Sequence, residues 1–298
     1  MFRRTMWVWI AAIVVVSGLT WVVPETTAGR PVTTADNPSG LEETVKQYLL
    51  KLSAEPGMES WKQAEWTTYP LGPGTHGWVV ILSKNGSEIG YMVLYATPDG
   101  AYELGEYGTG LSPLFSPHTL YRGLIRHELI PESADFAQFM KQTDLKDSRI
   151  YHDALFAFWK VNLAGRTYIF DAKTGEQLPV TEEQVDSLRP FRGQTVTVPL
   201  PDKVLDNFQR TPADPYENLS WLAQQPFEPD HFPSLKQTLQ HAKRLLFVAE
   251  MFSGQVLKPF AIAGYQEWET AGPYLIVDEE GLRYIPYSTA VRHGHFYD

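Results

Sequence analysis

Histidines and carboxylates near the C-terminus are the first residues of this 298-residue chain whose types suggest chemistry. His293, His295 and Asp298 are side chains that a zinc or nickel ion accepts as ligands. Chain ends usually fray, however, and a spacing of two residues does not put two ligands on one face of a helix. His127 and Glu128 lack the second histidine that a helical H-E-x-x-H zinc site needs. We therefore expect no metal site.

A pair of carboxylates, Glu103 and Glu106, offers a second kind of chemistry. With Tyr102 and Tyr107 beside them as a platform for a sugar ring, they are the residue types of a glycosidase acid and base. That mechanism needs a cleft and a carboxyl group whose pKa is raised by burial, which a small sheet rarely provides. The chain has no cysteine and no nucleophile-elbow, Walker or dinucleotide-binding motif. The sequence favours a protein without catalytic residues or cofactors, with a hydrolase as the alternative.

Aromatic side chains make up 13% of the chain and are a stronger signal than the charges. Alternation along an extended strand places Tyr91 and Tyr95 on one face of a sheet and Met92 on the other, and Tyr102 and Tyr107 follow on the next strand. These tyrosines either pack inside the protein or form a docking surface for a protein or a glycan. We take Tyr91, Tyr95, Tyr102 and Tyr107 as the candidate partner-binding residues.

The four tyrosines are expected on an antiparallel sheet that follows one helix. Apolar residues at helical spacing predict a helix over 41–54, with Ser39 and Glu42 as a capping box at its start. Alternating segments predict strands over 78–82, 88–96 and 101–107, and Asn85-Gly86 predicts a hairpin turn between the first two.

A second helix-and-strand pattern follows along the chain. Short helices are predicted after Ser116 and after Ser133, and a hairpin is predicted from strands over 155–163 and 167–170. Because the order of helix and then antiparallel strands recurs, residues 41–196 are either one domain or two degenerate units. The expected fold class is α+β, with helices packed on antiparallel sheets.

The C-terminal third begins with a stretch rich in proline. Residues 197–233 contain seven prolines, which predicts a linker or a packed irregular wrap. Ser234 and Gln237 predict the start of a helix that ends near Gly254. Strands over 260–265, 274–278 and 283–287 and a short helix over 288–293 are predicted next. We expect residues 234–298 to form a small α+β domain.

The amino terminus predicts export. Arg3 and Arg4 precede an apolar run over residues 6–23, which is nearly long enough to cross a bilayer and longer than a typical cleavable signal. Small residues up to Ala28 also fit a signal-cleavage site. Residues 1–28 are thus a retained single anchor or a signal cleaved near Ala28, and residues 29–40 are a tether. In either case the rest of the chain is expected outside the cytoplasm.

The balance of charge limits the partners. The formal net charge is −10 and the pI is about 5.3, so no broad basic field is available to attract nucleic acid. An acidic surface favours a basic face on a protein partner. The absence of cysteine also suits an oxidising compartment, because no thiol can mispair there.

The segment 158–176, with the sequence FWKVNLAGRTYIFDAKTGE, resembles the last hairpin of PepSY domains, in which an apolar hairpin ends in a D-A-x-T-G-E/K turn. Here Asp171 and Thr174 suit the turn and Gly175 suits its left-handed position. The resemblance covers about 20 residues and implies a PepSY/cystatin-like helix-on-sheet unit that is extracytoplasmic and not itself catalytic. Residues 108–149 depart from the single helix of that pattern.

Together these features lead to one functional hypothesis and its alternatives. The resemblance implies an envelope protein of the Gram-positive type that binds or regulates another envelope or membrane protein, without catalysing a reaction. The alternative is a hydrolase acting on envelope glycan or peptide, which should show a pocket with converging titratable groups. A structural spacer is a third possibility and should show neither a pocket nor an apolar patch.

Overall fold

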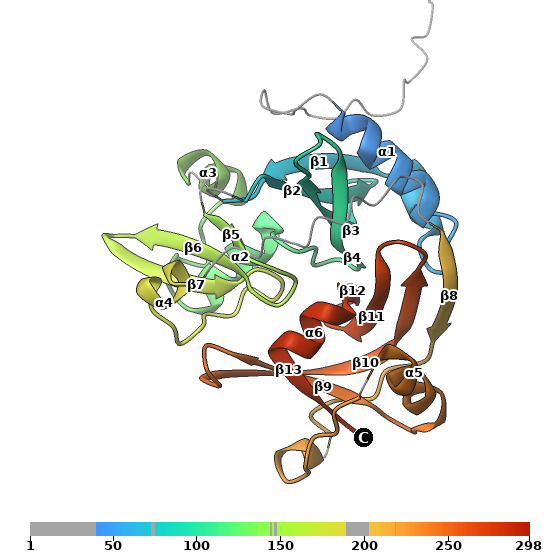
Figure 1. Ribbon diagram of the computed structural model, residues 1–298. Coiled ribbons are helices and arrows are strands. Elements are labelled where there is room, and N and C mark those ends of the chain that lie inside the picture. The colour runs from blue at the N-terminus through green and yellow to red at the C-terminus, as the bar shows by residue number, and fades with distance from the viewer. Residues whose placement is uncertain are drawn as a thin grey trace, which may run out of the picture. The chain divides into compact units, whose positions relative to one another are not determined.

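A large antiparallel sheet dominates the computed structural model, which describes residues 40–72, 75–143, 145, 148–188, 203–217, 219–229 and 231–298 (Figure 1). With few helices beside this sheet, the fold class is α+β, as the sequence predicts. The expected anchor or signal over residues 1–28 and the tether up to residue 39 lie outside the described residues. Within the described ranges, no helix is long and apolar enough to cross a membrane.

The first part of the fold is the predicted helix and meander, with one additional strand. Its elements are α1 (Leu41–Leu52), the short 3-10 helix η1 (Glu59–Gln63), β1 (Glu65–Pro70), β2 (Gly77–Lys84), β3 (Ser87–Ala96) and β4 (Tyr102–Thr109). Asn85 and Gly86 both have positive φ, 53° and 78°, as a two-residue hairpin turn requires. Gly40 occupies the N-cap position of α1 without a side-chain cap, so the predicted capping box from Ser39 is wrong.

The middle part forms a second, smaller sheet. Its elements are α2 (Pro117–Arg126), α3 (Phe136–Gln142), β5 (Arg149–Tyr151), β6 (Ala157–Leu163), β7 (Arg166–Asp171) and α4 (Glu182–Asp186), and the strand order is β5-β6-β7. Ser116 caps α2 as predicted, because its side chain accepts a hydrogen bond from the Thr119 N–H. The cap of α3 is Asp135 and not Ser133.

The C-terminal part corrects the predicted helix over 234–254. Its elements are β8 (Val204–Gln209), the 3-10 helix η2 (Ser220–Leu222), α5 (Phe232–His241), β9 (Leu246–Met251), β10 (Val256–Trp268), β11 (Gly272–Asp278), β12 (Leu282–Pro286), α6 (Tyr287–His293) and β13 (Gly294–Tyr297). The helix begins at the His231 cap and ends at His241. Its predicted second half is strand β9, because a short apolar run fits a buried strand as well as a helix.

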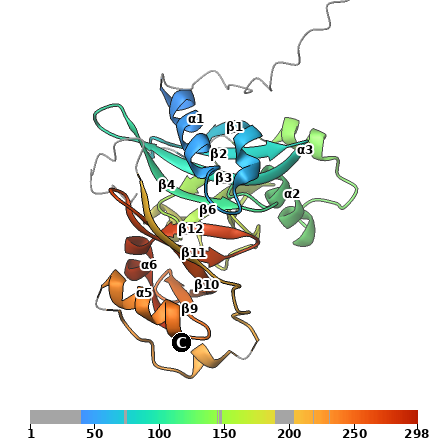
Figure 2. The same ribbon diagram turned by 90° about the vertical axis from the view of Figure 1, so that its right-hand side faces the viewer.

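One sheet joins the N-terminal and C-terminal parts. Its strand order is β1-β2-β3-β4-β12-β11-β10-β9-β13, and β8 also pairs with β10. The join is short, since β4 and β12 pair only at Gly108↔Arg283 and Tyr107↔Tyr284. The described residues therefore lie in a single compact unit, whereas the sequence suggests a separate domain over 234–298. Figure 2 shows the sheet running from the layer under α1 down to β9 and α5.

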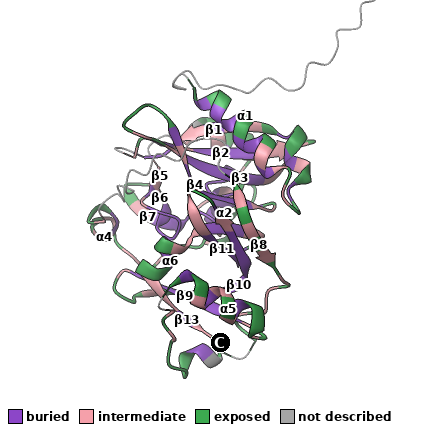
Figure 3. Cartoon of the chain, turned by 45° about the vertical axis from the view of Figure 1, so that its right-hand side comes forward, coloured by how far each residue is buried: buried purple, intermediate pink, exposed green. Residues whose placement is uncertain are grey.

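Three large apolar cores fill the space around these sheets, and buried residues concentrate on their strands (Figure 3). One lies between α1 and a face of the meander, and includes Val45 and Met92. A second lies on the opposite face of the meander, where Val93 packs with Trp159 of β6. The third surrounds β9–β12 and includes Leu239 of α5.

Candidate functional site

The four candidate partner-binding tyrosines lie inside the protein. Tyr91 and Tyr107 have no exposed surface, Tyr102 is 6% exposed and Tyr95 is partly buried. Tyr91 and Tyr95 belong to the core against the three-stranded sheet, whereas Tyr102 and Tyr107 belong to the core under α1. The expectation that they form a docking surface is not met, because both faces of the meander are covered. Internal packing, the other alternative, describes their positions.

A β-bulge decides which way Glu106 points. Val93 pairs with Glu106 and Leu94 pairs with Leu104, so Gly105 between them has no partner on β3. The extra residue shifts the alternation of β4 and turns Glu106 towards the face that carries Tyr91. A side chain at residue 105 would not fit, since a Cβ there would lie 2.4 Å from the Tyr95 ring.

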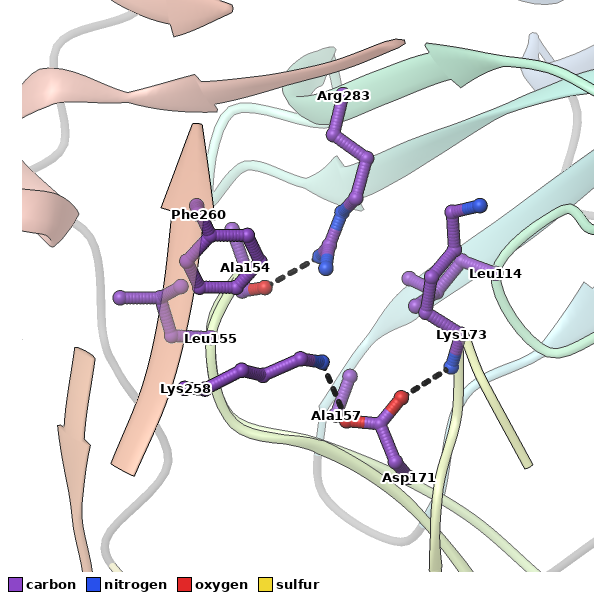
Figure 4. Close-up of a pocket in the computed structure, with 9 residues that line it drawn as sticks. All are labelled: Leu114, Ala154, Leu155, Ala157, Asp171, Lys173, Lys258, Phe260 and Arg283. Atoms are coloured by element: carbon purple, nitrogen blue, oxygen red, sulfur yellow. Dashed lines mark hydrogen bonds and ion pairs between the residues drawn. The ribbon is translucent and has the colours of Figure 1, made fainter. Parts of the chain in front are cut away.

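Six charged residues meet where the bulge directs Glu106. They come from β4, the end of β7 and the turn after it, β10, the turn after β11, and β12. We call them the Arg283 cluster: Glu106, Asp171, Lys173, Lys258, Glu279 and Arg283. Five of the six residues are at most 9% exposed, and the Lys258 side chain is 20% exposed. Figure 4 shows four of them, Asp171, Lys173, Lys258 and Arg283, with the apolar side chains around them.

All three nitrogens of the Arg283 guanidinium group donate hydrogen bonds. Its Nη2 donates to Glu106 Oε2 at 2.8 Å and to the Ala154 carbonyl oxygen, and its Nε donates to the Tyr91 hydroxyl at 3.0 Å. Its Nη1 donates to Glu279. The Tyr91 hydroxyl donates in turn to Glu106 Oε2 at 2.7 Å. The buried charge is thus paired with two carboxylates, and each of its three nitrogens donates a hydrogen bond, as a buried ion needs.

The D-A-K-T-G-E turn supplies the other half of the cluster. Asp171 Oδ1 accepts from the backbone N–H groups of Lys173 and Thr174, at 2.9 and 2.8 Å, as expected for this turn. Its Oδ2 accepts from Lys258 Nζ at 2.7 Å, and Lys258 also contacts Glu279. The turn therefore fastens the small sheet to the large one through an ion pair between β7 and β10.

Lys173 occupies the same junction without a direct carboxylate contact. Its Nζ donates to the backbone oxygens of Ser112, at 2.7 Å, and Glu280, at 3.1 Å. Burial lowers the pKa of Lys173 to about 8. Burial would raise the pKa of Asp171, but Lys258 outweighs that effect and holds it at about 2. For Lys258 the balance is opposite in sign, since burial lowers its pKa and the attraction to Asp171 and Glu279 raises it above the ordinary value.

The Arg283 cluster is closed to ligands. The space bordered by Asp171, Lys173, Lys258 and Arg283 is too small to admit a water molecule. An enzyme site needs room beside its titratable groups for a reacting molecule. In this arrangement the cluster can hold three parts of the fold together and respond to pH, but it cannot position a substrate.

Glu103 and Glu106 share one face of β4 but do not form an accessible acid and base. Glu103 pairs with Tyr95 and is half-buried, and burial raises its pKa. Glu106 has no exposed surface, and Tyr151 donates to its other oxygen at 2.9 Å. The hydrogen-bond partners of Glu106 described above are therefore residues inside the protein.

The three histidines singled out in the sequence contact different carboxylates. His293 Nε2 lies 2.7 Å from Asp153 Oδ2, and His295 lies 3.6 Å or more from its acidic neighbours. His127 contacts Glu176 at 3.3 Å. In the part of the chain that the structure describes, no group of three or more such side chains is arranged to hold a metal ion.

A surface groove along β7 is a feature that the sequence did not reveal. Its volume is about 340 Å³, and it lies between β7 and the segment 177–182 that leads into α4. Leu178 and Val180, which are partly buried, line it with apolar surface, and Arg166 and Glu182 line it with charge. Figure 1 shows α4 beside β7 at this place. The signal that could have indicated the groove is Pro179, which cannot extend a ladder of strand hydrogen bonds.

The charged residues of the Arg283 cluster gave a weak sequence signal. Arg283 and Lys258 each interrupt an alternating apolar segment, which is typical of a buried ion, but nothing in the sequence pairs them with Asp171 or Glu106. No family model, curated protein or solved structure matches this chain. Its function is therefore inferred from its own residues and geometry.

Proposed function

We propose that this protein is an exported envelope protein, anchored by its N-terminal apolar segment, that binds and thereby regulates another protein without catalysing a reaction. The observation that carries this proposal is a contrast between two places in the fold. The buried titratable groups of the Arg283 cluster are paired and closed to ligands, whereas the open groove has an edge strand and apolar side chains along it. Edge strands with apolar surface are typical of peptide and protein recognition.

The proposal extends to the family of the helix-on-sheet units. We infer two PepSY/cystatin-like units, one made of α1 with β1–β4 and one made of α2 with β5–β7. In support, α2 packs closely on the turn after β7: Arg126 donates to the Gly175 carbonyl oxygen at 3.1 Å, and a Cβ at Gly123 would lie 2.3 Å from that oxygen. A hydrolase of envelope glycan or peptide would instead need titratable groups open to substrate, which the Arg283 cluster does not offer.

The location can be tested with engineered cysteines, because the chain has none of its own. In intact cells a membrane-impermeant maleimide should label Gln47→Cys, which lies on the exposed face of α1, and should not label Phe2→Cys until the cells are lysed. Val45→Cys on the buried face of α1 is the matched control and should react only after denaturation. Labelling of Phe2→Cys in intact cells would contradict export through this anchor. Intact mass of the purified chain decides whether residues 1–28 remain.

Binding can be tested with a photo-crosslinking amino acid placed in the full-length chain in its native host. At Val180 in the groove, irradiation should yield an adduct with one envelope protein, identified by mass spectrometry. At Gln47 on α1 the same probe should yield no such adduct. Absence of an adduct at Val180, or the same set of adducts at both positions, would contradict the proposed function.

A further inference from the structure

The ladder of hydrogen bonds along the outer edge of β7 is incomplete. The Asp171 N–H donates to the Glu176 carbonyl oxygen and the Leu178 N–H donates to the Ile169 carbonyl oxygen, both at 2.8 Å. The next residue, Pro179, has no N–H, so the returning segment cannot continue the pairing. The edge of β7 is therefore covered at its C-terminal end and left open towards Arg166.

The hairpin register identifies the open backbone groups. Ala164 and Gly165 form a two-residue turn with φ of 51° and 77°, and Leu163 pairs with Arg166 next to it. In such a hairpin Arg166 and Tyr168 bond back to β6, whereas Thr167 faces away from it. Among the described residues, neither the N–H nor the C=O of Thr167 has a backbone partner. Thr167 is one of the residues that line the groove.

The charges at the groove are unequal. Glu182 shares Lys160 with Asp186, because the Lys160 Nζ lies 2.7 Å from Glu182 Oε1 and 2.9 Å from Asp186 Oδ1. Glu182 also accepts a hydrogen bond from the Thr167 hydroxyl at 2.9 Å. Arg166 is exposed, stands 5.4 Å from the centre of the Tyr168 ring, and has no carboxylate partner in the described ranges. The groove thus combines a free donor and acceptor on a strand edge with one available positive charge, although the chain as a whole is acidic.

We propose that the groove along β7 binds an extended peptide segment of a partner protein, which pairs with Thr167 and places an acidic side chain against Arg166. This inference rests on the proposed function and names the chemistry of its partner. The paired backbone groups supply affinity, and Arg166 with the apolar wall of Leu178 and Val180 supplies selectivity. The free N–H and C=O of Thr167 offer a donor and an acceptor side by side, which is the pattern that another extended backbone matches.

The probe is a phage-displayed library of random linear peptides, selected on the full-length protein in detergent. Enriched peptides are then synthesised and their Kd values measured by fluorescence anisotropy. We expect them to carry aspartate or glutamate, and to bind Thr167→Pro about tenfold more weakly, which corresponds to loss of one backbone hydrogen bond. Thr167→Pro should fold, because the missing N–H faces away from β6. Thr167→Val is the matched control: it keeps the N–H, loses only the hydroxyl, and should bind like the wild type.

Two further measurements test the acidic side chain and the backbone pairing separately. Arg166→Glu should weaken binding of the acidic peptides and spare variants in which their carboxylate is replaced by an amide. If Thr167→Pro does not fold, the backbone pairing is tested from the side of the peptide. An enriched peptide is N-methylated at alternate residues, either the odd-numbered or the even-numbered ones. Only one of these two methylation patterns should abolish binding. Lack of any enriched peptide, or equal affinity for Thr167→Pro and Thr167→Val, would overturn the inference. The adduct at Val180 would then still stand as evidence of binding, so the two failures are distinguishable.

Discussion

Arg283 of β12 and Glu106 of β4 form a fully buried ion pair, 2.8 Å between Nη2 and Oε2, beside the short join between the two parts of the large sheet. The two strands share only two residue pairs, so backbone pairing alone gives this join little support. Burial would lower the pKa of Arg283, but the attraction of Glu106, Tyr91 and Glu279 raises it well above its ordinary value. The guanidinium group of Arg283 therefore keeps its charge although it is buried.

Replacing Arg283 with Met should cost about 3–5 kcal/mol of unfolding free energy, because it leaves Glu106 buried without its cation and Glu279 with Lys258 alone. Urea unfolding followed by tryptophan fluorescence measures this loss. Lys46→Ala breaks an exposed pair with Glu42 and should leave the unfolding midpoint nearly unchanged. Equal effects of the two substitutions would contradict the role assigned to the cluster.

Asp171 should make the free energy of unfolding depend on pH in the acidic range. The pKa of Asp171 is about 2 in the folded protein, against an ordinary value of 3.8. Its carboxylate therefore takes up a proton at a lower pH in the folded state than in the unfolded chain. The stabilisation is present above pH 4 and is lost as the pH falls towards 2, by roughly 2 kcal/mol. Asp171→Asn cannot titrate there, so its deficit relative to the wild type should shrink over that interval in urea unfolding. A deficit that stays constant from pH 5 to pH 2 would show that Asp171 does not titrate as described.

Lys173 should make the stability depend on pH in the alkaline range, and there too the stability should rise with pH. Its folded pKa of about 8 lies below the ordinary 10.5, so between these values the unfolded chain holds more protons and stability rises with pH. Relative to Lys173→Met, the wild type should gain about 3 kcal/mol between pH 8 and pH 10.5. The comparison cancels the titration of the other lysines and the tyrosines. A difference that does not change with pH would mean that Lys173 keeps an ordinary pKa.

Gly105→Ala should destabilise the protein by roughly 1–3 kcal/mol, because the new Cβ meets the Tyr95 ring at 2.4 Å. The control is a double-mutant cycle with Tyr95→Ala, which removes the obstructing ring. In that background Gly105→Ala should cost much less, since the two changes share one contact. Additive effects in thermal unfolding would place the clash elsewhere.

The sequence predicted the local elements better than their assembly. The meander, the β6–β7 hairpin and the Ser116 cap follow from turn residues and alternation, which act over a few positions. The prediction of helix at strand β9 is wrong because Leu246 and Ala249 lie at helical spacing, whereas the strand is buried on both faces and directs these two residues into different cores. The Arg283 cluster could not be foreseen, because its members come from distant strands and because the bulge at Gly105 reverses the direction of Glu106.

The pairing of β4 with β12 also has a consequence for how the chain is made. Arg283 and Glu106 are 177 residues apart, so β4 leaves the ribosome long before its neighbour exists. Contacts of such sequence separation form late, because the entropy of closing a large loop must be overcome first. Until then the newly made chain carries an uncovered strand edge that invites association with other chains. A premature stop before β12 would leave that edge exposed permanently, and the truncated product should aggregate rather than fold.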